Sequence, residues 1–275
     1  MGSSANSGRV PLSFESITFE QDGGKATLTL NRPDALNALN VGMLSEVRNA
    51  LSVIQLGGQA RVLVLKGAGR SFCAGADIAK GTGANTGGGP FDAGRILEDH
   101  VNPMIELLAD LPIPIVSAVN GSAAGAGCSL ALAADFVVAA RSSFFLMAFT
   151  KVGLVPDAGA TWLLPRLVGK ARAVEMLMLA ERVPAATAHE WGMVYKVVDD
   201  DQLASASDEL ANRLAAGPTR SFALLRKALR DGMQTTLAES LRLERENQRT
   251  AGLSEDYNEG VKAFREKRQA RFQGR

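Results

Sequence analysis

Short apolar segments separated by polar, glycine-rich turns make up most of the chain. Residues 25–30 (KATLTL) alternate between polar and apolar side chains, which is the period of a strand with one buried face. Residues 61–66 (RVLVLK) and 113–119 (IPIVSAV) are short apolar runs, which are typical of strands buried on both faces. We therefore predict a strand over each of these segments, the second and third of them buried.

Helices and turns are predicted in the intervals between these strands. Residues 31–39 (NRPDALNAL) hold a proline and two asparagines, which favours a turn followed by a short helix. Residues 67–76 (GAGRSFCAGA) favour a turn, a short strand and another turn. A longer helix is predicted where apolar side chains recur at helical spacing, at Met43, Leu44, Val47, Leu51 and Ile54.

The region from 60 to 170 repeats a pattern of short strand, turn, short strand and helix. An Ala- and Leu-rich helix follows the turn at 120–127, and apolar strands are expected at 136–140 and 144–149. This is a ββα repetition, which differs from the strict βαβ alternation of a doubly wound sheet. We predict an α/β core built from these repeats.

The chain is expected to divide into three parts. Residues 1–12 are small and polar and predict a flexible tail, and residues 13–214 form the ββα core. From about Asp200 onward the pattern is entirely helical, and a boundary near 215 begins a C-terminal helical region over 215–275. Residues 81–89 (GTGANTGGG) hold five glycines and predict a surface loop, either a lid or a loop without a role.

Composition excludes several classes of protein. The 275 residues are 46% hydrophobic and carry a net charge of +1, so the chain can bury its own core and has no global field that attracts nucleic acid or a membrane. Two cysteines and two histidines in unrelated contexts predict neither a disulfide framework nor a zinc site. Residues 122–140 are mostly Ala and Gly and include Asp135, which favours a buried helix and strand over a membrane span. The first residues lack the apolar segment of a secretory signal, so we expect a cytoplasmic protein.

Two glycine-rich turns are the main chemical candidates, SFCAGAD (71–77) and NGSAAGAG (120–127). The second lies between a strand and a helix, as in a nucleotide site, but it is far from the first βα unit, and neither Tyr195 nor Tyr257 has a lysine four residues later. Backbone N–H groups from two such turns can instead form an oxyanion hole for a thioester. Tight packing of helix on strand is the structural alternative. The small residues that leave the backbone open are Ala74, Gly75, Ala76, Gly125, Ala126 and Gly127.

Two charged features allow more than one interpretation. Asp157 follows Pro156 and precedes an apolar segment, so it fits a helix N-cap as well as a proton carrier. Residues 262–275 carry a net charge of +5, which fits a solvated helix face or a nucleic-acid contact. Cys73 and Cys128 have no His or Lys neighbour in the sequence and are expected to be buried, inert thiols.

Six motifs in order, spanning roughly 15 to 275, resemble the crotonase (enoyl-CoA hydratase/isomerase) superfamily. They are NRPDALNAL (31–39), GAGRSFCAGADI (67–78), PIVSAVNGSAAGAG (114–127), GLVPDAGATWLLPRLVG (153–169), AHEWGMVYKVV (188–198) and EGVKAFREKRQARF (259–272). The resemblance implies a spiral ββα core, a C-terminal helical region that forms homotrimers or hexamers, acyl-CoA thioester substrates, and no metal or cofactor beyond the CoA of the substrate. By motif position, the oxyanion donors are the N–H groups of Ala76 and Ala126.

Within this superfamily the reaction depends on the carboxylates. At the two positions where the hydratases carry glutamates, this chain has Ser129 and Phe149. Hydration needs a base for water and an acid for the α-carbon, which these side chains cannot supply. Asp157 resembles the acid/base of epoxyphenylacetyl-CoA isomerases and related enoyl-CoA isomerases. We therefore expect an isomerase that shifts a double bond or rearranges a ring epoxide; the alternatives are a hydratase with another base and a non-catalytic acyl-CoA- or RNA-binding member.

The resemblance also implies a set of binding residues. Asp77 is expected to line the pocket, or alternatively to cap the next helix. Phe264 and Lys267 are expected to contact the CoA adenine and phosphates. In one arrangement, they contact the CoA across a subunit boundary. The remaining residues expected around the substrate are Asp34, Ala35, Leu36, Ala38, Ala74, Ile78, Gly125, Gly127, Ser129, Phe149 and Pro156.

Overall fold

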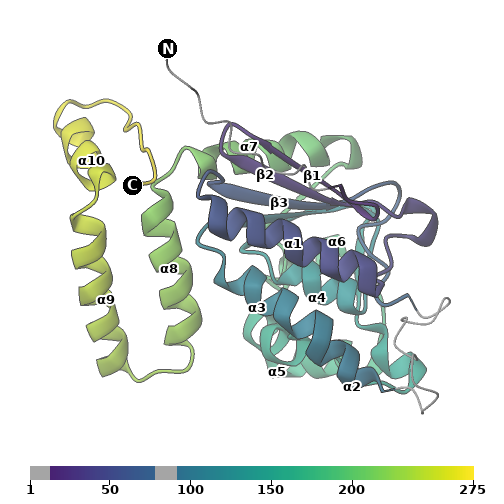
Figure 1. Cartoon of the computed structure of the whole chain (residues 1–275). Coiled ribbons are helices and arrows are strands. Elements are labelled where there is room, and N and C mark those ends of the chain that lie inside the picture. Colours follow the sequence, from purple (N-terminus) through teal and green to yellow (C-terminus); the bar gives the residue numbers. More distant parts are fainter. Residues whose placement is uncertain (1–12, 78–91) are drawn as a thin grey trace.

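A computed structural model describes residues 13–77 and 92–275 of the chain. The predicted N-terminal tail, Ile78 and the glycine-rich segment 81–89 lie outside these residues. Figure 1 shows a sheet with helices on both faces and, to one side, an arm of helices that ends with the C-terminus.

A six-stranded sheet runs through the centre of the fold. Its order is β1-β2-β3-β4-β6-β9, and every neighbouring pair is parallel except the β1–β2 hairpin. The strands are β1 (Ile17–Asp22), β2 (Lys25–Leu30), β3 (Val62–Gly67), β4 (Ile115–Val119), β6 (Phe136–Ala140) and β9 (Lys196–Val198). The strands predicted at 25–30, 61–66, 113–119 and 136–140 are therefore confirmed, with shifts of one or two residues at their ends.

A second, three-stranded sheet explains the repeat in the sequence. It has the order β5-β7-β8, formed by β5 (Ser122–Ala124), β7 (Phe144–Leu146) and β8 (Val183–Pro184). The consecutive pairs β4–β5 and β6–β7 each give one strand to each sheet, and a helix follows, which confirms the ββα repetition. The strand predicted over 144–149 ends at Leu146, because the chain turns into the 3-10 helix η3 (Ala148–Val152). The short strand predicted within 67–76 is reduced to isolated bridges at Cys73 and Ala76.

Two hydrophobic layers lie on the two faces of the large sheet. Leu63, Leu65, Ile115 and Val119 face the larger layer, which packs against α1, α3, α4 and α5, and the predicted helix over 43–54 is confirmed as α1. The smaller layer lies beneath α7 and is formed on the sheet by Val62, Val64, Val116 and Val138. The helices of the core are η1 (Pro33–Ala35), α1 (Val41–Gly57), α2 (Ala93–Ile96), the π-helical turn η2 (Leu97–Val101), α3 (Asn102–Asp110), α4 (Ala126–Leu132), α5 (Ala160–Leu179), α6 (Ala185–Glu190), η4 (Asp200–Gln202) and α7 (Leu203–Ala215).

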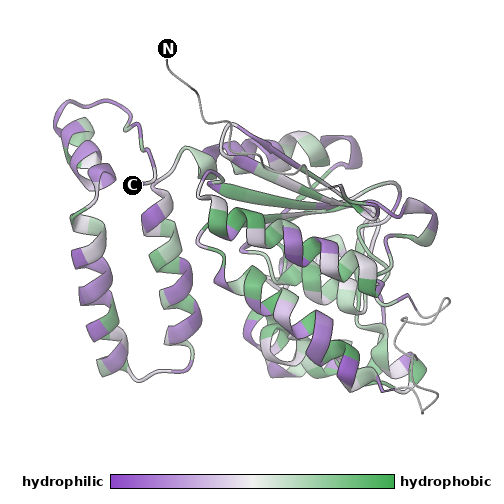
Figure 2. Ribbon diagram, in the orientation of Figure 1, coloured by the Kyte–Doolittle hydropathy of each residue, from purple (hydrophilic) through white to green (hydrophobic). Residues whose placement is uncertain are grey.

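The C-terminal part forms an arm of three helices that stands away from the core (Figure 1). These helices are α8 (Thr219–Gly232), α9 (Leu237–Gly252) and α10 (Glu255–Arg265). Figure 2 shows mixed hydrophilic and hydrophobic residues along α8 and α9, in contrast to the hydrophobic central strands. The prediction of an entirely helical C-terminus is wrong for the last ten residues, because the helix ends at Arg265 and Lys267 adopts a left-handed conformation (φ 53°) that turns the chain back.

Segment 122–140 contains the predicted buried helix and strand, α4 and β6, and its first residues form the strand β5 where a turn was predicted. Across residues 13–77 and 92–275, no helix combines the length and the apolar character that crossing a bilayer requires.

Candidate active site

The two glycine-rich turns are hydrogen-bonded to each other. The N–H of Cys73 donates to the carbonyl of Ser122 at 3.0 Å, and the N–H of Ala124 donates back to the carbonyl of Cys73 at 2.9 Å. The N–H of Phe72 donates to the carbonyl of Asn120 at 2.7 Å. These bonds hold segment 71–77 alongside the strand that leads into α4.

The opposite edge of the first turn is bonded to segment 31–39. The N–H of Leu39 donates to Gly75 at 2.7 Å, and the N–H of Asp77 donates to Leu39 at 2.9 Å. The N–H of Ala74 donates to the carbonyl of Leu36 at 3.0 Å. Three loops that are distant in sequence therefore share one small ladder of main-chain hydrogen bonds.

Glycine is required where these loops touch. A Cβ on Gly127 would lie 2.5 Å from the carbonyl oxygen of Cys73 and 2.6 Å from its sulfur atom. A Cβ on Gly75 would lie 2.9 Å from the carbonyl oxygen of Ala124, and Gly75 has a φ of 94° that L side chains rarely adopt. Tight packing, the structural alternative for these small residues, is thus present, and it is also what brings the two turns together.

Two N–H groups of this ladder have no acceptor among the described residues. In the parallel bridge between Leu39 and Ala76, Leu39 is hydrogen-bonded to the carbonyl of Gly75 and to the N–H of Asp77. Ala76 lies between these two residues, so its own N–H points away from Leu39. Ala126 is the first residue of α4, and its N–H has no intrahelical partner because it lies in the first turn. Both predicted donors are therefore available to an oxygen atom that approaches the turns.

Asp157 lies in the loop between η3 and α5. One carboxylate oxygen, Oδ1, is buried and has no hydrogen-bond partner in the part of the chain that the structure describes. Burial raises the pKa of this carboxyl to about 6. The cap residue of α5 is Gly159, and no side chain caps this helix. The N-cap interpretation of Asp157 is therefore wrong: its carboxylate takes no part in the start of the helix, and only its carbonyl accepts the N–H of Ala160, at 3.0 Å.

The residues at the two hydratase glutamate positions lie beside this loop and the second turn. The Ser129 hydroxyl, in a residue that is 1% exposed, donates to the carbonyl of Asp157 at 3.1 Å. The buried ring of Phe149 lies against the second turn, 4.0 Å from where a Cβ on Gly125 would stand. The residue at the first position, Ser129, therefore restrains the main chain of Asp157, and the residue at the second position, Phe149, is apolar.

Segment 31–39 holds two residues that sequence reasoning missed. The buried Asn37 amide donates to the carbonyls of Ala68 (2.9 Å) and Ser71 (2.7 Å). Arg32 donates to the carbonyl of Ala38 at 2.6 Å and pairs with Asp77 at 2.8 Å. Both belong to the NRPDALNAL motif. The signal that could have found Asn37 is a polar residue between the apolar Leu36 and Ala38, and Arg32 has no such signal.

Asp77 is buried and neutralised by Arg32, whose side chain is also largely buried. The first helix after it that the structure describes is α2, and Asp92 caps that helix through the N–H of Gly94 at 2.9 Å. The expected cap at Asp77 thus has no support in the described residues, and its carboxylate instead fastens the first turn to segment 31–39.

The other predicted binding residues divide into two groups. Those from segment 31–39 and from the two turns come together around the ladder, while Pro156 adjoins Asp157. Asp34 is exposed, Ala35, Leu36, Ala74 and Pro156 are half-buried, and Ala38, Gly125 and Gly127 are buried. Phe264, which is 85% exposed, and the exposed Lys267 lie instead in and just after α10 of the arm, away from α4 (Figure 1).

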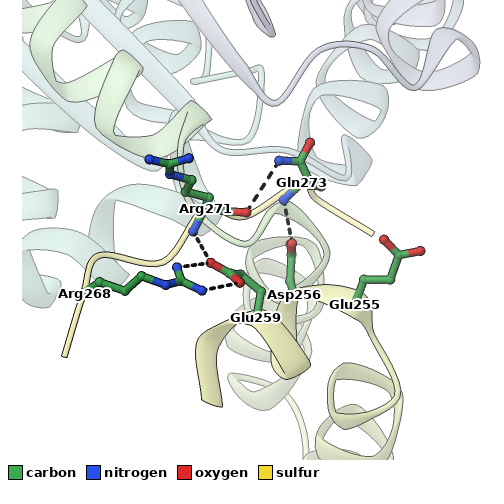
Figure 3. A pocket seen from close by; sticks show the side chains of 6 residues that line it. All are labelled: Glu255, Asp256, Glu259, Arg268, Arg271 and Gln273. Carbon is green, nitrogen blue, oxygen red and sulfur yellow. Dashed lines mark hydrogen bonds and ion pairs between the residues drawn. The ribbon is translucent and has the colours of Figure 1, made fainter. Parts of the chain in front are cut away.

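The basic C-terminal segment folds back on α10. Figure 3 shows Arg268 paired with Glu259 at 2.6 Å, and the main-chain N–H of Gln273 donating to Asp256 at 2.6 Å. Arg275 pairs with Glu255 at 2.8 Å. Two of its six basic side chains, Arg268 and Arg275, are therefore paired with carboxylates, while Lys262 and Arg265 lie on α10 itself.

The two cysteines are buried free thiols, as expected. Burial raises the pKa of Cys73 and of Cys128 to about 12, and the Cys73 thiol donates to the carbonyl of Asn37 at 3.1 Å. Protonated, buried thiols of this kind serve packing beneath the turns.

Comparisons with known proteins agree with this geometry. The family model described as Enoyl-CoA hydratase/isomerase matches residues 20–275. The chain is 47% identical to 1,2-epoxyphenylacetyl-CoA isomerase of Escherichia coli K12 (95% of this chain, all of that protein) and 43% identical to a probable enoyl-CoA hydratase of Rhodobacter capsulatus (96% of this chain, all of that protein). Among solved structures, a putative enoyl-CoA hydratase from Streptomyces coelicolor superimposes with a TM-score of 0.90 at 36% identity over the full length of both chains. The chain therefore belongs to the crotonase superfamily, as an enzyme of the enoyl-CoA hydratase/isomerase family that acts on acyl-CoA.

Proposed function

We propose that this enzyme is an acyl-CoA isomerase in which Asp157 carries the proton and the N–H groups of Ala76 and Ala126 form the oxyanion hole. The observation that carries the proposal is the half-buried carboxylate of Asp157, in a loop bonded to α4, whose buried Oδ1 has no hydrogen-bond partner among the described residues. Ser129 and Phe149 supply no second carboxylate at the hydratase positions. The reaction shifts a double bond along the acyl chain or rearranges a ring epoxide.

The two N–H groups donate hydrogen bonds to the thioester oxygen. They stabilise the negative charge that develops on this oxygen when a proton leaves the adjacent carbon. Loss of one such donor typically costs about 2.7–4 kcal/mol of activation free energy, so the main chain of the two turns contributes as much as the acid.

Asp157 removes a proton from one carbon of the acyl group and returns it to another. A pKa of about 6 suits this cycle, because the carboxylate is mostly ionised at pH 7 and yet is a stronger base than an ordinary aspartate. The enzyme returns to its starting state after each turnover, and the chemistry requires no cofactor beyond the CoA of the substrate.

Names of relatives support isomerisation without deciding it. Besides the E. coli protein, a Streptococcus mutans relative that is 34% identical is a trans-2-decenoyl-[acyl-carrier-protein] isomerase. The R. capsulatus relative is named a probable enoyl-CoA hydratase, so hydration with another base is the alternative reaction. Against that alternative, the Ser129 hydroxyl is already bonded to a carbonyl, and Phe149 has no group that can activate water.

Three substrates separate the candidates. We expect the enzyme to convert a 3-enoyl-CoA to the conjugated 2-enoyl-CoA, or to rearrange 1,2-epoxyphenylacetyl-CoA, and to hydrate crotonyl-CoA slowly or not at all. Fast hydration of crotonyl-CoA with no change in the other two compounds would reject the proposal. Asp157→Asn should lower kcat by about 10²–10⁴ with CoA affinity retained, whereas a non-catalytic binder would have no turnover to lose.

We also propose that the region 215–275 mediates assembly into a homotrimer or hexamer. The large apolar side chains of α8 and α9 that are exposed in one chain support this, and they are Leu225, Leu229, Met233, Leu237 and Leu241. In this arrangement Phe264 and Lys267 contact the CoA held by a neighbouring subunit. Sedimentation analysis tests the assembly, and a monomer at micromolar concentration would contradict it.

A further inference from the structure

A proton carrier must be held in position, yet within residues 13–77 and 92–275 the buried Oδ1 of Asp157 has no hydrogen-bond partner that could hold it. The loop that carries it also has an unusual conformation. Ala158 and Gly159 follow with φ angles of 50° and 80°, and a left-handed alanine costs on the order of 1 kcal/mol. The orientation of this aspartate therefore has to be imposed through its main chain.

One side chain from another element does so. We infer that Ser129 is the positioning residue of the proposed isomerase: its hydroxyl holds the carbonyl of Asp157 and thereby aims the carboxylate. This inference rests on the proposed function, in which Asp157 carries the proton. Among the described residues, the 3.1 Å bond from Ser129 is the only hydrogen bond between loop 153–159 and α4.

The location of Ser129 makes this bond effective. It lies one turn into α4, the same helix whose first residue, Ala126, supplies an oxyanion donor. The start of α4 is held against the first turn, because Gly127 packs directly on Cys73. One short helix thus fixes both the N–H group that receives the thioester oxygen and the main chain of the group that moves the proton.

The chemistry favours an anchor at the carbonyl rather than at the carboxylate. A hydrogen bond to the ionised carboxylate would stabilise that form and weaken the base. A bond to the carbonyl restrains the backbone and leaves both carboxylate oxygens free of it. The alternative acceptor of the Ser129 hydroxyl, the carbonyl of Gly125, is farther away at 3.5 Å.

Ser129→Ala tests the inference, with Ser117→Ala as its matched control. Ser117 on β4 is also fully buried, but its hydroxyl has no hydrogen-bond partner among the described residues. We expect Ser129→Ala to lower kcat for the 3-enoyl-CoA substrate tenfold or more, because misplacement of a reacting group by about 1 Å can cost 10²-fold. KM should stay within twofold of the wild-type value, and Ser117→Ala should leave both constants unchanged.

Two further readouts separate positioning from other roles. The apparent pKa of the kcat profile should be the same in Ser129→Ala as in the wild type, because the hydroxyl does not contact the carboxylate. Ser129→Thr, which retains a hydroxyl, should recover part of kcat. A raised KM with unchanged kcat would make Ser129 a substrate-binding residue and overturn the inference.

Equal losses in Ser129→Ala and Ser117→Ala would also overturn it, since they would reflect packing alone. A separate result would reject the proposed function itself: full turnover in Asp157→Asn. An inactive Asp157→Asn together with a fully active Ser129→Ala would reject only the positioning role.

Discussion

The candidate active site and the C-terminal arm are held by different forces. The loops of the site are joined by main-chain hydrogen bonds and by glycines in direct contact, and the ion pair between Arg32 and Asp77 is buried among them. The arm is joined to the core through the largely buried Arg226, and to its own tail through arginines and carboxylates nearer the surface.

Arginine side chains make most of the attachments of the arm. Arg226 of α8 pairs with Asp135 at 2.7 Å, and Arg230 pairs with Asp110. Arg61, just before β3, donates to the carbonyls of Gly217 (2.7 Å) and Phe272 (3.0 Å), which belong to the hinge and to the tail. The ion pairs of the tail are the more exposed ones and are screened by salt, whereas the main-chain contacts of the site are not, so the tail and the site should respond differently to ionic strength.

The largest effect is expected at the contact between the two turns. Gly127→Ala places a methyl group where the Cys73 carbonyl and sulfur already stand, so the turns must separate. We expect loss of nearly all turnover and a decrease of about 3 kcal/mol or more in the free energy of unfolding. The matched control is Gly252→Ala, also at a helical glycine but with no atom within 4 Å, which should be neutral or slightly stabilising. A fully active Gly127→Ala would show that the turns need not touch.

The second prediction concerns Asp157, whose replacement should increase the free energy of unfolding and decrease activity. The pKa of Asp157 rises from 3.8 in the unfolded chain to about 6 in the folded one, so the folded state holds more protons between these values and stability falls as pH increases through this window. Above pH 6 the penalty is about 2–3 kcal/mol, since each pKa unit corresponds to 1.36 kcal/mol.

Asp157→Asn should therefore unfold at higher denaturant concentration than the wild type at pH 7, while kcat collapses. Turnover of the wild type should decrease below pH 6 as the base becomes protonated. Equal stability of the two proteins at both pH 7 and pH 4 would mean that this carboxylate is well solvated.

Arg61 provides the corresponding test on the arm. Arg61→Ala removes the bonds to Gly217, Thr219 and Phe272, and we expect a loss of about 1.5–3 kcal/mol, as for hydrogen bonds that involve a charged group. Proteolysis near 216–218 should become faster. Arg213→Ala on α7 is the control, because that exposed side chain has no ion pair or hydrogen bond among the described residues. If catalysis rather than the arm suffered from Arg61→Ala, the division between the two regions would be wrong.

The smallest effect is expected at the ion pair between Arg268 of the tail and Glu259 of α10, which Figure 3 shows. The Arg268 guanidinium, together with the N–H of Arg271, lowers the pKa of Glu259 to about 2. The stabilisation from this pair is therefore present above the usual glutamate pKa and is lost as pH falls toward 2. Glu259→Gln should change thermal stability slightly at low salt and not measurably at high salt, as differential scanning calorimetry would show. A large change that salt does not reduce would place this pair among the structural contacts of the core.

Local patterns predicted the core well because strand alternation and buried runs depend on near neighbours. The strands at 25–30 and 113–119, the ββα order and the helix over 43–54 all followed from side-chain periodicity. The C-terminal tail was mispredicted because its path depends on the pairing of Arg268 with Glu259 on α10, across a reversal of the chain.

The sequence predicted which residues form the candidate site better than it predicted the contacts between them. The two turns and Asp157 could be named from motifs, and the absence of a carboxylate at 129 and 149 is a fact of the sequence. The bond from Ser129 to a carbonyl 28 residues away, and the pairing of Arg32 with Asp77, depend on tertiary approach, which no local pattern encodes.

The isolated bridges Leu39–Ala76 and Cys73–Ala123 have a consequence for solvent exchange. The amides of Leu39, Cys73 and Ala124 are committed to the ladder and should take up deuterium slowly and together, although they belong to three separate loops. The amides of Ala76 and Ala126 have no such commitment. A thioester bound as proposed would slow uptake at these two positions first, so that occupancy of the proposed oxyanion hole becomes visible without any turnover.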